Sequence, residues 1–447
     1  MKHIITICFL AVFSFGFSQD LPSSFTLQEA IDYALKNNRQ AQNAQKDIAA
    51  AEKQKWETTA TGLPQLNASA NYQNFLKQQV SVVPAEFFGG NPGEFAEVIF
   101  GTKQNATATA TLNQLLFDGS YIVGLQSAKV FLQISENAKV KTDLEVRKAV
   151  IEAYGNVLLA KESVAIGEKN IEVIQKNLND TQKIYENGLE EEESVEQLQI
   201  TLSNLQSNLN NAKRLLDIAK QMLNITMGIE FNANISLTDS LETLTIQNIN
   251  LSTLTTDITV ENTIDYRIAS NDKTSKELLV KLEKSKALPS LSAYLNGGYN
   301  SFSDDFVFFD NNNEWFGFSS FGLNLNVPIF SSGKRSAATQ RAEINLEKAQ
   351  NNLTETEQRL KLQIASAQSN YRFAVEDYEN KKLNLRLAER IENKNQTKFF
   401  EGIGTSFELQ QAQTQLFGAQ QDLLQSMLNV INSKAALETL TNQTTTF

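Results

Sequence analysis

Apolar residues recur at every seventh position over long stretches of the chain, and the whole pattern occurs twice in the same register. The matched series in the two halves are Val195, Leu202, Leu209, Leu216 and Leu223, and Leu409, Leu416, Leu423, Val430 and Leu437. The positions three residues further on are mostly apolar or small in both halves. An apolar residue about every 3.5 positions predicts helices that pack along a continuous seam, as in a coiled coil.

A second pair of series lies upstream, on two stretches without proline, about Ser120 to Tyr185 and about Lys334 to Phe400. Its members are Val150, Val157, Val164, Ile171, Leu178 and Tyr185, and Ile364, Tyr371, Tyr378, Leu385, Glu392 and Phe399, where Glu392 is the one break. Each stretch predicts a helix of roughly 90 to 100 Å, which is too long for a compact globule. Each ends near a glycine, Gly188 or Gly402, so we expect a long antiparallel helical hairpin, present twice.

The segments between these helices alternate polar and apolar residues with a period of two, which predicts strands with one apolar face. Pro64 and Pro289 each end a helix and open an extended segment. The expected strands run from Leu66 to about Phe75, from Gln104, from Leu291 to about Tyr299, and from Phe321. The loop of about Lys77 to Lys103 in the first repeat is longer than that of about Ser301 to Glu314 in the second.

Strands of roughly ten residues have the length of a membrane β-strand. Four of them cannot close a barrel, and lipid does not tolerate an open sheet edge. Several chains must then share one barrel, and three copies would give twelve strands, whereas the eight strands of two copies would leave an interior filled by side chains. The expected segments are a signal peptide (1–18), a first repeat (19–230), an equatorial linker (231–260), a second repeat (261–440) and a tail (441–447).

Composition removes most catalytic chemistry from consideration. The only histidine and the only cysteine, His3 and Cys8, lie in the expected signal peptide. The mature chain then has no disulfide, no thiolate nucleophile, no Ser-His-Asp relay and no zinc or copper site, and we expect no catalytic, cofactor or metal site. A formal net charge of −11 also makes it a poor binder of nucleic acid.

Short motifs at the junctions of these elements give the chain a specific resemblance. They are Leu63-Pro64-Gln65-Leu66 and Leu288-Pro289-Ser290-Leu291 before strands, Leu116-Phe117-Asp118-Gly119 and Ile329-Phe330-Ser331-Ser332-Gly333 before the long helices, and Tyr185-Glu186-Asn187-Gly188-Leu189 and Phe400-Glu401-Gly402-Ile403-Gly404 at the hairpin tips. In this order, and over essentially the whole mature chain, they resemble TolC-type outer-membrane efflux proteins.

The resemblance implies a mainly helical fold with a membrane β-barrel: a homotrimer with a twelve-stranded barrel in the outer membrane of a Gram-negative bacterium and a twelve-helix tunnel in the periplasm. About Gly228 to Val260 and the C-terminal tail would form an equatorial band around the helices. Such proteins are passive exit ducts that dock to a periplasmic adaptor, or membrane fusion protein, and to an inner-membrane pump of RND or ABC type.

The resemblance also implies site residues at the hairpin tips. Glu408 falls at one position of an acidic entrance ring and Gln411 at the next, where the acidic pattern is broken; an arginine of some relatives would fall at Gly404. The expected tip and adaptor-contact residues are Gly188, Glu190, Glu191, Glu192, Glu193, Gly402 and Gly404. The four glutamates could instead be a solvated helix start, and Glu408 a simple first-turn acid.

Aromatic residues near the strand ends could form an interfacial girdle in the membrane, or could simply pack. They are Tyr72, Phe75, Tyr299, Trp315, Phe316 and Phe318. The alternative function is a secreted structural or adhesive coiled-coil protein, which would explain the heptads but not the matched strand pairs. An enzyme is not expected, because the acids are spread along helices and loops without a recurring cluster.

Overall fold

The computed structural model describes residues 24–250 and 258–443. The expected signal peptide with His3 and Cys8, part of the expected equatorial linker, and the terminal Phe447 lie outside the described residues. The chain divides into two compact units. The first comprises Met1–Gln42, Thr142–Ile258 and Gln363–Phe447, and the second comprises Asn43–Lys141 and Thr259–Leu362. Each unit therefore takes segments from both sequence repeats.

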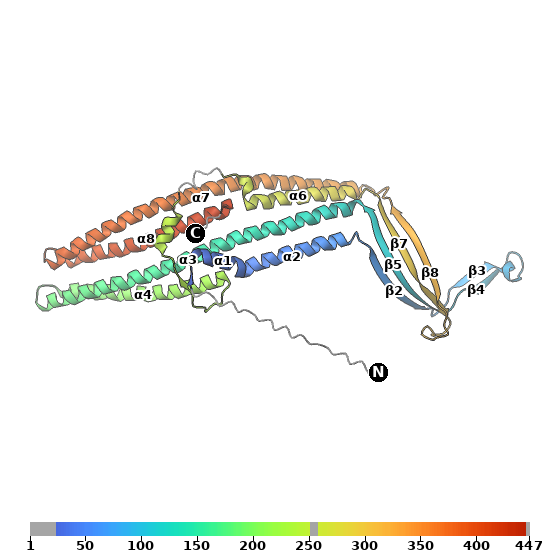
Figure 1. The fold of residues 1–447 in the computed structure, drawn as a ribbon, viewed down its shortest axis with the longest axis horizontal. Coiled ribbons are helices and arrows are strands. Elements are labelled where there is room, and N and C mark those ends of the chain that lie inside the picture. Colours follow the sequence, from blue (N-terminus) through green and yellow to red (C-terminus); the bar gives the residue numbers. More distant parts are fainter. Residues whose placement is uncertain (1–23, 251–257, 444–447) are drawn as a thin grey trace, which may run out of the picture. The chain divides into compact units, whose positions relative to one another are not determined.

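The second unit contains a four-stranded antiparallel sheet (Figure 1). Its strands, in spatial order, are β2 (Gln65–Asn74), β5 (Gln104–Asp118), β7 (Ser290–Ser303) and β8 (Phe316–Asn326). All four expected strands are present, and β8 begins five residues earlier than the alternation from Phe321 indicated. One register shift interrupts the β5–β7 pairing, between Leu115 and Phe117.

The register gives this sheet one apolar and one polar face. Leu66, Leu112, Leu295 and Phe321 form a continuous row across the four strands. The next row, on the opposite face, consists of Asn67, Thr111, Asn296 and Ser320. The apolar face is exposed, with Leu66 and Phe321 at 71% and 70% exposure. An exposed apolar surface of this kind requires a partner or a lipid phase to cover it.

Both outer strands of the sheet lack a neighbour on one side. Within the described residues, β2 pairs only with β5 and β8 only with β7. Because the four strands alternate in direction, β2 and β8 run antiparallel to each other. The sheet therefore ends in two complementary edges of unpaired N–H and C=O groups.

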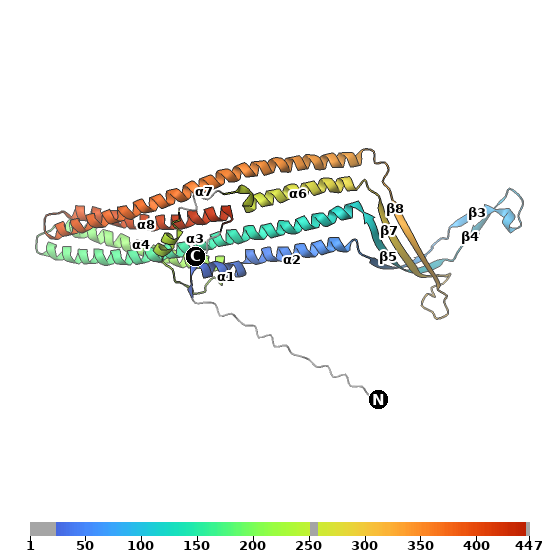
Figure 2. The same ribbon diagram turned by 45° about the horizontal axis from the view of Figure 1, so that its top comes forward.

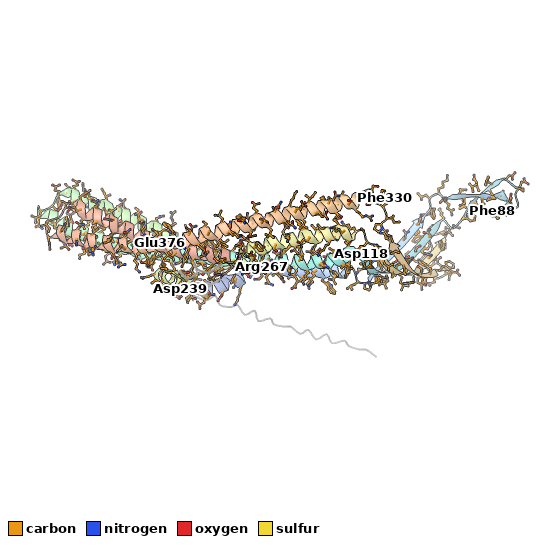
Figure 3. The ribbon with its side chains drawn as sticks, turned by 90° about the horizontal axis from the view of Figure 1, so that it is seen from above. Phe88, Asp118, Asp239, Arg267, Phe330 and Glu376 are labelled. Atoms are coloured by element: carbon orange, nitrogen blue, oxygen red, sulfur yellow. The ribbon has the colours of Figure 1, made fainter. Side chains whose placement is uncertain are left out.

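The long loop of the first repeat contains a hairpin that the sequence analysis did not predict. Strands β3 (Val80–Pro84) and β4 (Phe95–Ile99) pair antiparallel, and the short helix η1 (Ala85–Phe88) joins them. One face of this hairpin is exposed along its whole length, and Phe88 lies at its end (Figure 3). The segment is thus a structured projection of the sheet and not a plain loop.

Helices approach and leave the sheet at the predicted junctions. The second unit contains α6 (Ile264–Ser285), preceded by the short helix η3 (Val260–Asn262), and most of α2 (Arg39–Ala60). The Asp118 carboxylate accepts hydrogen bonds from the N–H groups of Ser120 and Tyr121 at 2.6 and 3.1 Å, which satisfies the free donors at the start of the next helix. Asp118 lies at this junction in Figure 3.

That next helix, α3 (Gly119–Glu186), and its counterpart α7 (Lys334–Phe400) confirm the two predicted long helices almost to the residue. Each begins in the second unit and ends in the first, where it forms a hairpin with α4 (Glu192–Met227) or α8 (Ser406–Thr441). Figures 1 and 2 show the two hairpins side by side within this unit. Among the described residues, no helix has the length and apolar character needed to cross a bilayer.

The predicted heptad positions supply much of the core of the first unit. Val150, Val157, Tyr371, Val430 and Leu437 are all buried. Small residues allow close approach, since a Cβ at Gly155 would meet the Leu428 side chain at 2.6 Å. The mainly helical fold with four sheet strands is therefore confirmed.

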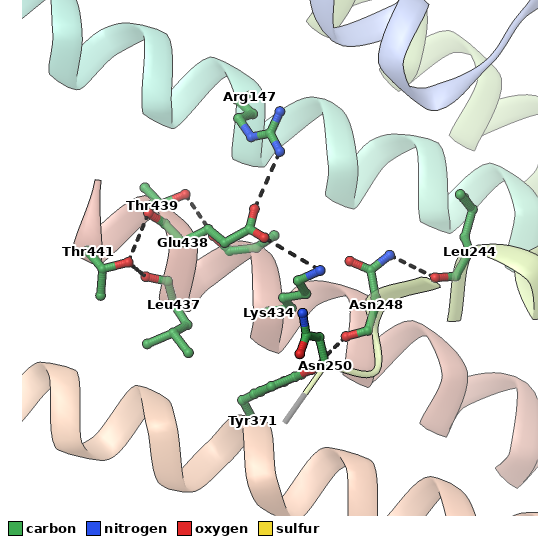
Figure 4. Close-up of polar contacts among 11 residues, drawn as sticks. Arg147, Leu244, Asn248, Asn250, Tyr371, Lys434, Leu437, Glu438, Thr439 and Thr441 are labelled. Carbon is green, nitrogen blue, oxygen red and sulfur yellow. Dashed lines mark hydrogen bonds and ion pairs between the residues drawn. The ribbon is translucent and has the colours of Figure 1, made fainter. Parts of the chain in front are cut away.

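A buried ionic group holds the C-terminal helix against α3. Glu438 accepts from Arg147 Nη2 at 3.4 Å and faces Lys434 Nζ at 3.7 Å, and all three side chains are at most 8% exposed (Figure 4). Burial lowers the pKa of Lys434, and the neighbouring Glu438 opposes that shift.

A second buried polar contact joins α7 to the short helix α5 (Leu241–Asn248). The Tyr371 hydroxyl donates to the carbonyl of Asn248, at the end of α5, at 2.6 Å.

The start of the described chain is fixed by residues far away in sequence. Strand β1 (Ser24–Phe25) pairs in parallel with β6 (Ser236–Leu237), and α1 (Leu27–Asn37) follows it. The hydroxyl of Tyr154 lies 2.8 Å from Asp239 Oδ2 and 3.0 Å from the Phe25 carbonyl. Asp239 also accepts from the N–H of Leu27 at 2.7 Å. Burial and the Asp239 carboxylate raise the pKa of Tyr154.

Candidate functional site

The two hairpin tips of the first unit lie together at one end of its helices (Figure 1). The Ser194 hydroxyl at the start of α4 lies 2.8 Å from that of Ser406 at the start of α8. One turn further on, the Gln410 amide donates to the Thr201 hydroxyl at 3.1 Å. The fold thus brings the expected tip residues of both repeats into a single surface.

Glycines shape both tips, as the sequence predicted. Gly188 and Gly402 have φ angles of +70° and +74°, in the left-handed region that ends a helix without a Cβ penalty. Gly404 has a different reason to be glycine. Its N–H donates to the Lys398 carbonyl at 3.1 Å, and a Cβ there would lie 2.9 Å from the Lys398 Cβ. Any larger residue at position 404 would have to displace α7.

Glu408 forms a capping box with Thr405 at the start of α8. Its carboxylate accepts from the Thr405 N–H at 3.2 Å, and the Thr405 hydroxyl accepts from the Glu408 N–H at 3.2 Å. Both Glu408 and Gln411 are exposed. Glu408 is therefore an acidic residue of the first helical turn, as one of the two alternatives predicted. Its carboxylate is still exposed to solvent. The role of Glu408 at the channel entrance stays a prediction.

The four glutamates of the first tip are divided between the turn and the helix. Glu190 accepts from Ser194 at 2.6 Å, and Glu191 is the N-cap of α4 without a side-chain capping bond. Glu192 and Glu193 occupy the first helical turn, where the helix dipole favours negative charge. Glu191, Glu192 and Glu193 are exposed, so they form an acidic rim as well as a helix start.

Apolar residues beside the acidic rim were missed by the sequence analysis. Leu189, Ile403 and Phe407 are exposed by 78%, 73% and 65%, although large apolar side chains seldom gather on a free surface. Leu189 and Ile403 each follow a tip glycine directly, which is the signal that could have identified them. The tip surface thus combines exposed apolar area with negative charge.

A buried polar layer crosses the hairpins near the tips. Glu392 of α7 is only 6% exposed, and burial raises the pKa of its carboxyl, which the adjacent Gln413 amide only partly offsets. One turn along α7, Gln396 donates to the buried Asn177 of α3 at 3.5 Å. The single break in the predicted heptad series is therefore a polar site inside the bundle.

In the second unit, the register corrects the expected aromatic girdle. Tyr72 and Tyr299 lie on the apolar face, through the pairs Tyr72↔Ala106 and Ala108↔Tyr299. Phe316 and Phe318 pair with Asn300 and Gly298 on the opposite, polar face. The residues predicted as a girdle therefore do not share one face, because side chains alternate strictly along a strand.

The remaining girdle residues have individual surroundings. Phe75 and Trp315 lie just outside the strands that they flank. The Tyr72 ring packs edge-on against Phe306 and Phe308, and its hydroxyl lies 2.9 Å from Gln104 Oε1. These packing contacts thus contribute to the position of the Tyr72 side chain.

Nowhere in the described chain do three or more potential ligands among His, Cys, Asp and Glu gather closely enough to hold a metal ion.

Comparison with known proteins agrees with this architecture. A family model described as outer membrane efflux protein matches residues 30–228 and 274–443. No curated protein matches the chain.

Solved structures of outer-membrane channels share the fold. The CusC channel is 20% identical, with a TM-score of 0.74 over 93% of this chain and 91% of CusC. The outer membrane protein VceC of Vibrio cholerae is 17% identical, with a TM-score of 0.70 over 93% and 95% of the two chains. The CmeC outer membrane channel of Campylobacter jejuni is 18% identical, with a TM-score of 0.71 over 93% and 85%.

Proposed function

From the premise that this chain belongs to the outer membrane efflux protein family, we propose that three copies assemble into one passive exit duct. Family membership makes the chain an outer-membrane channel protein of a Gram-negative bacterium whose helices extend into the periplasm. The observation that carries the proposal of a trimer is the four-stranded sheet with two free, antiparallel edges. β8 of one copy can pair with β2 of the next, so that three copies close a twelve-stranded barrel.

The faces of the sheet support this assembly. The exposed row through Leu66 and Phe321 would face lipid, and the row through Thr111 and Asn296 would line an aqueous interior. Strands β2 and β8 have 10 and 11 residues, which is the length of a membrane span. Tyr72 and Tyr299 would be the girdle residues of the lipid face. The family match favours this channel over a secreted structural coiled-coil protein.

In the first unit, the hairpin tips would receive a periplasmic adaptor and so connect the duct to an RND or ABC pump. The support is the tip surface itself, where Leu189, Ile403 and Phe407 are exposed next to Glu191 to Glu193. Glu408 and Gln411 would face the entrance, where three copies of Glu408 form a ring of negative charge. Such a ring favours cations over anions in the pore.

Conductance of purified trimers in planar bilayers tests the duct and the entrance separately. We expect small pores that prefer cations, and we expect Glu408→Gln to reduce this preference. Glutamine at this position retains the capping box with Thr405, so the helix start is preserved while the charge is removed. Glu408→Ala loses both and serves as the comparison.

If the wild type and Glu408→Gln form pores of the same cation selectivity, Glu408 does not contribute to the charge at the entrance. A protein that is monomeric in detergent and forms no pores would refute the exit duct itself.

A further inference from the structure

Three phenylalanines lie on the polar face of the sheet, among amide and hydroxyl side chains. Phe302 of β7 and Phe316 and Phe318 of β8 are 51%, 54% and 36% exposed. Phe316 pairs with Asn300, which lies two residues before Phe302 on β7. Phe318 lies in the next row, opposite Gly298. The three rings thus occupy three successive rows over roughly 13 Å of the sheet. We call them the aromatic patch.

The rings of the aromatic patch pack on the sheet and on each other. A Cβ at Gly298 would meet the end of the Phe318 ring at 3.1 Å, so this ring lies over a position that has no side chain. The Phe302 and Phe316 rings are 6.4 Å apart and tilted by 38°. These contacts explain how the rings are oriented, but each ring still leaves a third or more of its residue exposed. Exposed apolar patches on a polar surface mark sites of interaction.

The other half of the same face is polar. In the row of Phe316, β2 and β5 contribute Asn71 and Thr107, and in the row of Phe318 they contribute Ser69 and Thr109. The aromatic patch is therefore confined to β7 and β8. It lies opposite the apolar face and cannot be part of a lipid-facing surface, because side chains alternate between the two faces of a sheet.

Negative charge surrounds the open end of the aromatic patch. The two loops that join the strands at this edge, 75–103 and 304–315, contain seven acidic residues and two lysines. Asp304 follows Phe302 by two residues, and its carboxylate accepts from the Lys103 N–H at 2.9 Å. The aromatic ring faces also attract positive charge. The surroundings therefore favour a cation over an anion. The acidic residues of the second loop, all exposed, are Asp304, Asp305, Asp310 and Glu314.

The aromatic patch lies at the end of the sheet that is farthest from the helices of its unit. Strands β2 and β7 begin shortly after α2 and α6 end, at Gln65 and Ser290. Phe302, in contrast, is the last residue but one of β7, and Phe316 is the first of β8. In the proposed duct the helices lie in the periplasm, so this end of the sheet is the external mouth.

We propose that the aromatic patch binds aromatic organic cations at the external mouth of the duct. The inference rests on the proposed function, because closure of the barrel turns the polar face inward. The phenylalanine faces contact the cationic centre and the apolar ring of the ligand, and the carboxylates of the loops attract its charge. All three rings belong to two paired strands of one chain, so each copy contains a complete site.

Fluorescence of Trp315, which directly precedes Phe316, reports binding at the aromatic patch. Trp56→Phe removes the only other tryptophan. The full-length protein with this change is purified in a non-ionic detergent and titrated with N-benzylpyridinium, an aromatic cation that quenches tryptophan. We expect quenching that saturates, whereas collisional quenching by neutral acrylamide rises linearly. Benzyltrimethylammonium should compete with the quencher, and benzenesulfonate, which has the opposite charge, should not.

Variants separate the ring faces from their apolar area. The double variant Phe302→Leu, Phe316→Leu keeps apolar side chains but removes two ring faces, and it should weaken binding about five- to thirtyfold. Phe316→Tyr keeps the ring and should bind as the parent protein does. Phe321→Leu changes an exposed phenylalanine on the opposite face of β8 and is the matched control, which should also bind normally.

Pore formation in planar bilayers separates failure of the inference from failure of the duct. If the protein forms pores but the quenching stays linear, or benzenesulfonate competes as well as benzyltrimethylammonium, the inference is overturned and the duct remains. Unchanged affinity in the double leucine variant would also overturn it, because the cation would then bind elsewhere. A protein that forms no pores would refute the duct, and with it the placement of the aromatic patch at an external mouth.

Discussion

Replacing Glu392 with leucine is expected to stabilise the tip half of the helical hairpins. Glu392 occupies a core position of the heptad series, where the other repeat has Leu178. It is buried on α7, and its raised pKa shows that the site disfavours the charged carboxylate. The substitution therefore restores the apolar pattern at the one position that departs from it.

The expected gain follows from burial. Burying a leucine side chain contributes about 1.5–3 kcal/mol, and the desolvation cost of the carboxylate disappears as well. What is lost in exchange is the contact with the adjacent Gln413 amide, which only partly offsets the effect of burial on the Glu392 carboxyl. A gain of about 1.5–3 kcal/mol slows local opening by roughly 10- to 150-fold.

The pH dependence gives an independent signature. The pKa of Glu392 is higher in the folded chain than the ordinary value of 4.5, so its stabilising contribution is complete below about pH 4.5 and is lost as pH rises through the folded-state pKa. The wild-type tips should thus become less protected as pH increases over this window. The leucine variant, which has no titrating group there, should lack this component.

Hydrogen–deuterium exchange of the trimer, read by mass spectrometry on peptides covering 388–415 and corrected for intrinsic exchange rates, measures both effects. Glu392→Gln is the matched control, since it removes titration but adds no apolar burial. It should abolish the pH component without the full gain in protection. Faster exchange in Glu392→Leu, or the same pH response in all three proteins, would refute the reasoning.

Two further predictions concern the buried polar groups of the first unit. Glu438→Gln should lower the thermal stability of the trimer by about 3–5 kcal/mol, because it removes the buried carboxylate that Arg147 and Lys434 both face. Lys434→Met keeps the Arg147–Glu438 pair and should be neutral or stabilising, and equal losses in both variants would contradict this account. Tyr154→Phe should cost about 1–3 kcal/mol, because Asp239 loses a buried hydrogen-bond donor, and limited proteolysis should release the N-terminal strand sooner than in the wild type.

Periodicity predicted the long elements well. Heptad spacing within proline-free stretches of more than 60 residues leaves no alternative to a helix, and α3 and α7 begin and end within a residue of the expected positions. The Leu-Pro junctions placed the starts of β2 and β7 equally closely, although β7 continues to Ser303, four residues beyond its expected end. These signals are strong because each repeats a local physical requirement many times, or fixes a backbone angle outright.

Features that depend on the exact register were predicted less well. Phe316 and Phe318 differ in parity from Phe321, so they had to lie on the other face, yet the expected strand began only at Phe321. The hairpin of β3 and β4 was hidden by the glycines of its loop. Thr405 and Glu408 have the spacing of a capping box, which the sequence alone could have shown.

Periodicity alone could not predict which polar faces of the long helices remain uncovered. The four-residue spacing of the basic residues from Arg386 to Lys398 is visible in the sequence, but a solvated helix has the same pattern. Only the burial of Ala388 and Phe399 on the other side of α7 shows that this row points outward.

The clamp on β1 imposes an order on how the polypeptide can fold as it leaves the cytoplasm. The Leu27 N–H donates to Asp239, which lies 212 residues further along the chain, and the Phe25 carbonyl accepts from the Thr238 N–H and the Tyr154 hydroxyl. During export from the N-terminus, the first strand must wait until more than half of the chain has been threaded across the inner membrane. Until then its binding site does not exist, so β1 cannot pair with β6 before the segment around Asp239 has crossed.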